Sequence, residues 1–180
     1  MHTELQQAFD VLELQRKKIL ELARELPPNA FNQRPRENKW SASEILSHIV
    51  SAEHLSALYI RKKMQGASSA KDSGAFEEAK FLLLQLSQRL PGLKFKAPRK
   101  VVETTVVYRE LEALVNAWEN VRDDLKSVLE KIPDTYVRRK IFKHARAGYL
   151  NVRQGLMFLR EHIIHHTPQI KKLVRQTHSL

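Results

Sequence analysis

The sequence predicts an all-α protein built as a four-helix bundle. Four long segments repeat apolar residues at the helical spacing, one shorter helical segment lies between the second and third of them, and strand patterns are nearly absent. Amphipathic helices joined by one long crossover are typical of such a bundle. Since 180 residues suffice for one core and hardly for two, we predict a single domain over residues 1–180.

The first two helices have clear ends in the sequence. Apolar residues share one side of the segment 3–26, and the Pro27-Pro28 pair stops that pattern. The second helix is expected over 41–65, directly after Trp40. Its first residues, Ser41-x-x-Glu44, form a capping box, in which each side chain bonds the other's backbone N–H.

The last two long helices are equally well delimited. One is expected over 107–132 and ends at Pro133. The other is expected to open between residues 148 and 151, with Asn151-x-x-Gln154 as its cap, and to run to residue 176. We therefore predict that the polypeptide enters and leaves the bundle at defined positions.

A long crossover connects the second and third helices of the bundle. It carries an extra short helix, expected over 76–90, followed by Pro91-Gly92 and an extended stretch. The only candidate strand is the run VVETTVV at 101–107, and it is not persuasive. The prediction is thus a bundle without a structural sheet.

The composition restricts the chemistry. The chain has no cysteine, which excludes disulfides, thiolate nucleophiles and cysteine-based zinc sites, and leaves His, Asp and Glu as metal ligands. No apolar run reaches the roughly 18 residues that span a membrane, and the amino terminus lacks the apolar region of a signal peptide. We predict a cytoplasmic protein without a membrane partner.

The net charge of +11 admits two interpretations. A basic protein can bind nucleic acid or another anionic surface. The basic residues are dispersed, however, in clusters at 16–18, 94–100, 138–140 and 171–175, and no base-stacking motif accompanies them. A solvated surface is therefore favoured, and a basic nucleic-acid-associated protein is kept as the less favoured alternative.

Two histidines on the last helix point toward the bundle interior. Residues at i and i+4 lie on the same side of a helix, as His162 and His166 do. On a helical projection, His166 lies about 30° and His162 about 70° from the centre of the apolar side that contains Leu159 and Ile163. His165 lies about 130° away from that centre and is expected at the surface.

A third histidine faces inward from the second helix. His48 lies about 70° from the centre of the apolar side around Ile45 and Ile49, whereas His54 lies almost opposite and is expected at the surface. Three imidazoles from two helices suit a divalent metal with open coordination positions. The remaining histidines carry little information: His2, His144 and His178.

The pattern alone also allows a plainer interpretation. A single histidine beside an apolar stripe is more often a hydrogen-bonded core residue than a ligand. Three such residues are harder to explain in this way, because burying three imidazoles without partners costs several kcal/mol. Both interpretations stay open on the pattern of His48, His162 and His166.

These motifs resemble the DinB-like superfamily. The resemblance rests on Trp-Ser-x-x-Glu-Ile-Leu-x-His at residues 40–48 and on Glu-His-x-x-His-His-x-x-Gln-Ile at residues 161–170, with further similarity at 94–98 and 144–148. It covers most of the chain. It implies an up-down-down-up four-helix bundle, often a homodimer, in which His48, His162 and His166 hold a divalent metal.

One residue departs from the family pattern. The family often has a small residue where this chain has Pro168. Proline there removes the backbone hydrogen bond to the carbonyl of Ile164 and is expected to kink the helix just beyond the histidines.

The family includes thiol-dependent S-transferases and mycothiol-dependent maleylpyruvate isomerase-like proteins. The resemblance thus implies a thiol-dependent S-transferase or a hydrolase acting on a small-molecule substrate. Because the chain has no cysteine, a thiol would come from a low-molecular-weight cosubstrate. Three imidazoles suit zinc, nickel or iron(II), so the ligand set does not select the metal. A stress-linked module that binds metal or a small ligand without turnover is the alternative.

No catalytic residue is evident from the sequence. Glu161 precedes His162 but projects about 140° away from the apolar side. Glu44 lies one turn before His48, where capping is favoured over a role as hydrogen-bond partner of that imidazole. Packing is the favoured explanation for three nearby aromatic residues: Trp40, Tyr59 and Phe158.

Overall fold

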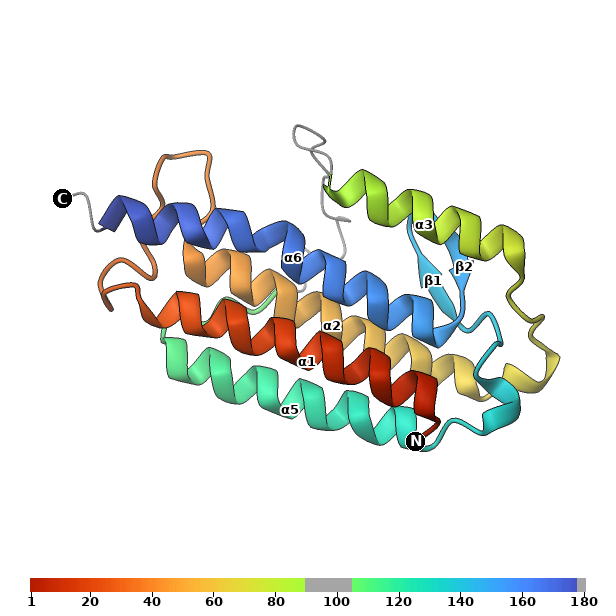
Figure 1. Ribbon diagram of the computed structural model, residues 1–180. Helices are drawn as coiled ribbons and strands as arrows, with labels where there is room; N and C mark the ends of the chain where they lie inside the picture. The colour runs from red at the N-terminus through yellow and green to blue at the C-terminus, as the bar shows by residue number, and fades with distance from the viewer. Residues whose placement is uncertain (90–104, 178–180) are drawn as a thin grey trace.

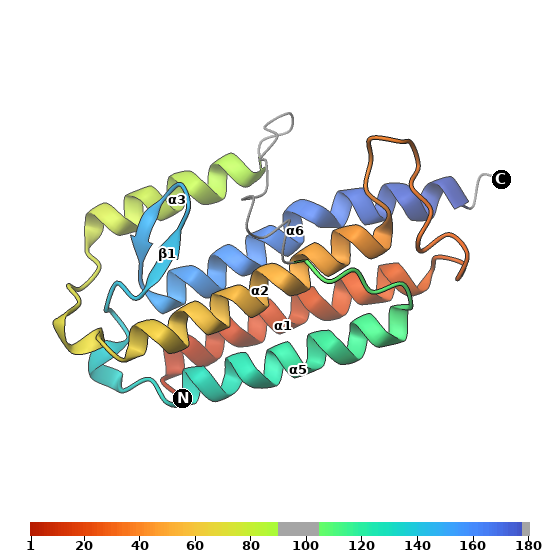
Figure 2. The ribbon, with the colours of Figure 1, turned by 180° about the vertical axis from the view of Figure 1, so that it is seen from behind.

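Four long helices form the bundle in the computed structural model, which describes residues 1–89 and 105–177. They are α1 (Thr3–Arg24), α2 (Ala42–Met64), α5 (Leu111–Glu130) and α6 (Val152–Thr177). Figures 1 and 2 show α1 and α6 running in one direction and α2 and α5 in the other. The all-α, up-down-down-up bundle predicted from the sequence is therefore confirmed.

The caps predicted from the sequence form as expected. The Ser41 side chain accepts the backbone N–H of Glu44 at 3.2 Å, and the Glu44 carboxylate accepts the N–H of Ser41 at 2.8 Å. Asn151 and Gln154 make the same reciprocal pair at 2.8 and 3.0 Å. Helix α6 continues through Pro168 to Thr177. Both histidine-bearing helices thus begin at fixed positions.

A small layer covers one end of α6. It consists of α3 (Ala75–Arg89) and the hairpin of β1 (Phe142–His144) and β2 (Gly148–Leu150), which lie beside each other in Figures 1 and 2. Gly148 has φ = 72°, a left-handed conformation that glycine adopts without strain. A polar contact between Lys140 and Glu77 at 3.2 Å ties the chain before the hairpin to α3.

The hairpin was missed by the sequence prediction. Three residues per strand are too few to show the alternation of apolar and polar residues that indicates a strand. The candidate strand at 101–107 lies mostly outside the described residues, and its described part, 105–107, forms no strand. The extra helix is observed at α3, close to its predicted range.

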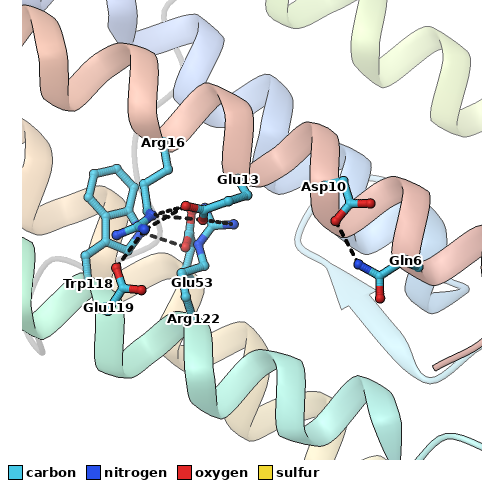
Figure 3. A network of polar contacts seen from close by, with 8 residues as sticks. All are labelled: Gln6, Asp10, Glu13, Arg16, Glu53, Trp118, Glu119 and Arg122. Atoms are coloured by element: carbon cyan, nitrogen blue, oxygen red, sulfur yellow. Dashed lines mark hydrogen bonds and ion pairs between the residues drawn. The ribbon is translucent and has the colours of Figure 1, made fainter.

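A network of buried charges joins three helices of the bundle (Figure 3). Glu53 on α2 is 0% exposed, and its carboxylate accepts the indole N–H of Trp118 at 2.8 Å and a guanidinium N–H of Arg122 at 2.9 Å, both on α5. Arg16 on α1 forms ion pairs with Glu13 at 2.6 Å and with Glu119 at 2.7 Å.

This network corrects the prediction that the basic residues are solvated. Arg16 belongs to the cluster at 16–18, yet it is buried, because carboxylates from its own helix and from α5 compensate its charge. Burial raises the pKa of Glu53, and the contacts with Arg122 and Trp118 oppose that rise. The charged form of the Glu53 carboxylate is therefore stabilised by Arg122 and Trp118.

We expect Arg122→Met to lower the free energy of unfolding by about 3–5 kcal/mol, because it leaves the buried Glu53 carboxylate without its cation. The double variant Glu53→Gln/Arg122→Met should lose less, since no uncompensated charge remains. Urea denaturation measures both. The exposed pair of Arg61 and Asp124, 3.3 Å apart, supplies the control: Arg61→Met should cost less than about 1 kcal/mol. Equal losses for Arg122→Met and Arg61→Met would contradict the expectation.

Candidate metal centre

Helices α2 and α6 bring the three predicted histidines together. The Nε2 atoms of His48 and His162 are 3.1 Å apart, and those of His166 and His162 are also 3.1 Å apart. The ligand atoms of all three lie within 4.8 Å of one another. The helical projections predicted that each ring faces inward, and the resemblance predicted that the three rings meet.

Burial keeps the three imidazoles neutral. It lowers the pKa of His48 to about 4 and that of His166 to about 3, and it lowers the pKa of His162 well below the ordinary value. The neighbouring histidines lower the pKa of His162 further. All three rings therefore have a lone pair available at neutral pH, as metal ligation requires.

Hydrogen bonding among the rings cannot satisfy their nitrogens. Both short contacts converge on Nε2 of His162, which carries either one proton or one lone pair. The Nδ1 atoms of His48 and His162 are buried and have no hydrogen-bond partner. A cation would accept three lone pairs at once.

The spacing of the nitrogens agrees with such a cation. Nitrogens bound at 2.0–2.1 Å in tetrahedral geometry lie roughly 3.3 Å apart, close to the two observed separations of 3.1 Å. Three protein ligands leave coordination positions open, whereas a structural zinc site closes with four. The donor set thus fits a divalent metal with room for a small molecule.

Aromatic side chains flank the cluster. The Trp40 ring lies edge-on to His48, with centroids 5.2 Å apart, and the Phe158 ring stacks on His162 at 5.9 Å and 13°. On the third ring, Nδ1 of His166 lies 3.3 Å from Oε1 of Gln169. Trp40 and Phe158 do pack, as predicted, but they pack against the histidines themselves.

The hairpin supports this aromatic side of the centre. The Phe142 ring lies directly over Gly155 of α6, where an added Cβ would be 2.7 Å from Phe142 Cγ. Phe142 also packs on Phe158, with centroids 6.3 Å apart. A side chain at position 155 would displace Phe142 and disturb the packing behind His162.

Three other expectations for individual residues have mixed outcomes. His54 is exposed as predicted. His165 is partly buried rather than at the surface, and its ring packs edge-on to His166 at 5.2 Å. Glu44 serves as the predicted cap and also forms an ion pair with Arg34, which lowers its pKa.

The prediction for Glu161 was wrong. Its side chain is 1% exposed and accepts a hydrogen bond from Arg160 at 2.6 Å. Helix α6 packs against α1, α2 and α3, so burial extends around more of its circumference than one apolar stripe indicates.

Sequence reasoning assigned no role to two residues beside the cluster, of which Gln169 contacts His166 and His144 contacts Phe158. Gln169 is a turn beyond His166, and this i,i+3 spacing is the only signal that could have indicated the contact. His144 lies on the unpredicted hairpin, where its ring packs on Phe158 at 4.4 Å. It could not be placed without β1 and β2.

The fold and the clustered imidazoles define a helical-bundle protein with a three-histidine centre. The chain belongs to the DinB superfamily, whose family model matches residues 12–170. A comparison with curated proteins finds no match.

A solved structure shows the same fold. YfiT from Bacillus subtilis, described as a probable metal-dependent hydrolase with an unusual four-helix bundle topology, superposes with a TM-score of 0.58. The match covers 98% of this chain and 90% of that one, at 13% sequence identity. In the described part of this chain, no helix combines the length and apolar character needed to cross a membrane.

We expect the free energy of unfolding of the metal-free protein to fall as the pH drops from about 6.5 toward 4. The folded state holds His48 with a pKa of about 4 and His166 with a pKa of about 3, whereas histidine in an unfolded chain titrates near 6.5. Between these values the unfolded state binds more protons and is favoured; above 6.5 both states are neutral and the effect vanishes. Urea denaturation across this pH range measures the dependence.

The control separates these rings from other histidines. His166→Leu should reduce the pH dependence by the contribution of one ring, since other histidines with depressed pKa values remain. The exposed His54→Leu should leave it unchanged. The same dependence in His166→Leu and in the unsubstituted protein would show that His166 is not held neutral by burial.

Proposed function

We propose that this protein binds a divalent metal through His48, His162 and His166 and uses it to transform a small molecule. The observation that carries the proposal is the convergence of three neutral imidazoles, whose Nε2 atoms meet at 3.1 Å in two pairs and cannot all be satisfied by one another. Zinc, nickel and iron(II) are the candidate metals. The description of YfiT as a probable metal-dependent hydrolase supports the same class of activity.

The favoured reactions are thiol-dependent S-transfer and hydrolysis. A divalent metal in this centre would lower the pKa of a thiol or a water molecule at an open position. Because the chain has no cysteine, the thiol is a low-molecular-weight cosubstrate. Trp40 and Phe158 place apolar ring surface against His48 and His162.

A second candidate is a module that binds metal or a small ligand without turnover. Its support is that aromatic rings, His165 and the amide of Gln169 contact the three imidazoles, an environment that can hold a ligand without reacting with it. The basic nucleic-acid-associated alternative rests on the net charge of +11, and the burial of Arg16 and Arg122 weakens it.

Two features of the protein's context complete the proposal. We infer a cytoplasmic protein, since a chain without cysteine fits a reducing compartment. We also infer a homodimer, consistent with several exposed apolar side chains on α3, namely Phe76, Leu82, Leu83 and Leu86.

We expect His166→Ala to abolish metal binding and His165→Ala to leave it nearly intact. The Nε2 of His166 lies 3.1 Å from that of His162, whereas His165 stands outside the group of converging nitrogens. Mass spectrometry of purified protein, after chelation and reloading with zinc, nickel or iron(II), measures the metal content. Equal loss in both variants would contradict the assigned ligands.

If the centre is catalytic, the metal-loaded protein should transfer a low-molecular-weight thiol to an electrophile. With 1-chloro-2,4-dinitrobenzene, the thiolate sulfur bonds to the ring carbon, chloride leaves with its electron pair, and the thiol proton goes to solvent. The rate should persist below about pH 8, because the metal depresses the thiol pKa, and should vanish after chelation or in His48→Ala.

The panel of thiols comprises glutathione, bacillithiol, mycothiol and coenzyme A. A parallel assay with a carboxylic ester as substrate tests hydrolysis. If protein shown to contain metal gives no rate above the uncatalysed reaction in either assay, the binding module replaces the enzyme as the proposed function.

A further inference from the structure

The hairpin holds a fourth imidazole, His144, next to the three-histidine centre. Its ring packs edge-on to Phe158, with centroids 4.4 Å apart, and Phe158 stacks on His162. His144 also contributes to the electrostatic lowering of the pKa of His162. The side chain therefore stands at the edge of the centre without being one of its converging ligands.

The hairpin turn fixes the protonation of this ring. Nδ1 of His144 accepts the backbone N–H groups of Arg146 at 3.2 Å and Ala147 at 3.1 Å, so it carries no proton. Burial, with a further contribution from Arg146, lowers the pKa of His144 to about 4. The neutral ring then keeps its single proton on Nε2 and presents that nitrogen as a hydrogen-bond donor.

The donor is available to a ligand. Among the described residues, no hydrogen-bond partner of His144 Nε2 is found. His144 Nε2 is not one of the buried nitrogens that lack a partner, and the residue is partly exposed. The turn uses Nδ1 of the ring and leaves Nε2 to donate to a ligand.

The surroundings favour an anionic group on that molecule. Residues 138–153, which include both strands of the hairpin, contain six basic residues and no acidic one. Lys143 lies over the Tyr149 ring at 5.4 Å, and Arg146 follows His144 in the turn. Asp72 and Glu77 pair with Arg139 and Lys140, so Lys143, Arg146 and Arg153 supply most of the remaining charge. A carboxylate accepts hydrogen bonds and is attracted by that charge.

We propose that His144 is a substrate-recognition residue whose Nε2–H donates a hydrogen bond to a carboxylate of the small molecule, the other end of which occupies the metal centre. This inference rests on the proposed function, since it assumes a metal held by His48, His162 and His166. It adds the substrate class: a small molecule with a metal-binding head and a carboxylate.

The test uses the full chain loaded with cobalt(II), whose visible spectrum reports ligand binding. The two probes are acetohydroxamate and succinic monohydroxamate, which share a metal-binding head and differ by a carboxylate. We expect the second to bind roughly tenfold more tightly, the effect of one charge-assisted hydrogen bond.

The variant His144→Asn separates recognition from structure. The asparagine Oδ1 can accept the N–H groups of the turn in place of Nδ1, whereas the Nε2 donor is lost. We expect this variant to bind both probes equally, with the affinity for acetohydroxamate and the cobalt content unchanged. The exposed His54→Asn serves as the control and should retain the tenfold preference.

Each other outcome overturns the inference. If His144→Asn still prefers succinic monohydroxamate, the preference comes from the general positive charge of the hairpin and not from His144. Equal binding of both probes to the unsubstituted protein would show that the protein does not recognise a carboxylate on the ligand. If the cobalt protein binds neither probe, or binds no cobalt, the proposed metal function itself fails, and the role of His144 fails with it.

Discussion

The packing of α2 against α6 is the contact on which the centre depends. The two helices run in opposite directions, so the early part of α2 meets the later part of α6 (Figure 1). His48 reaches the other two rings only at this crossing, with 3.1 Å between its Nε2 and that of His162. A metal centre requires its ligand atoms to be placed to within about 0.5 Å. Other contacts must therefore fix the position of α2.

Two sets of contacts fix α2 from sides other than α6. Glu53, five residues beyond His48, is clamped by Trp118 and Arg122 of α5. Nearer the start of the helix, the Ser43 hydroxyl donates to the carbonyl of Tyr108 at 2.6 Å. The charge network therefore contributes to the geometry of the centre as well as to stability, because a shift of α5 would move α2 and, with it, His48.

The sequence predicted what depends on local chemistry. Helix ends followed from Ser41 with Glu44 and from Asn151 with Gln154, because a capping box involves residues three apart. The inward direction of His48 and of the other two histidines followed from helical periodicity. That they converge was expected from the resemblance, since periodicity gives the direction of a side chain along one helix and not the distance to another helix.

What the sequence did not predict depends on contacts between distant segments. Arg16 is buried because Glu119 comes to it from α5, and no pattern within residues 16–18 indicates that partner. The hairpin is recognisable only from its pairing, and the role proposed for His144 follows from the turn that holds it. Glu161 was misplaced because α6 has three neighbouring helices instead of one.

The burial of the imidazoles links stability to the proposed metal function. Apolar surroundings depress the pKa values of His48 and His166, which keeps their lone pairs free, but they also leave Nδ1 of His48 and of His162 without partners. Unpaired buried polar groups destabilise the fold, and a cation bound at Nε2 leaves these Nδ1 atoms unpaired. A cation that binds the folded chain and not the unfolded one stabilises the fold by mass action. The apolar surroundings that keep the three imidazoles neutral thus keep their Nε2 lone pairs available to a divalent metal, whose binding offsets part of the cost of burying them.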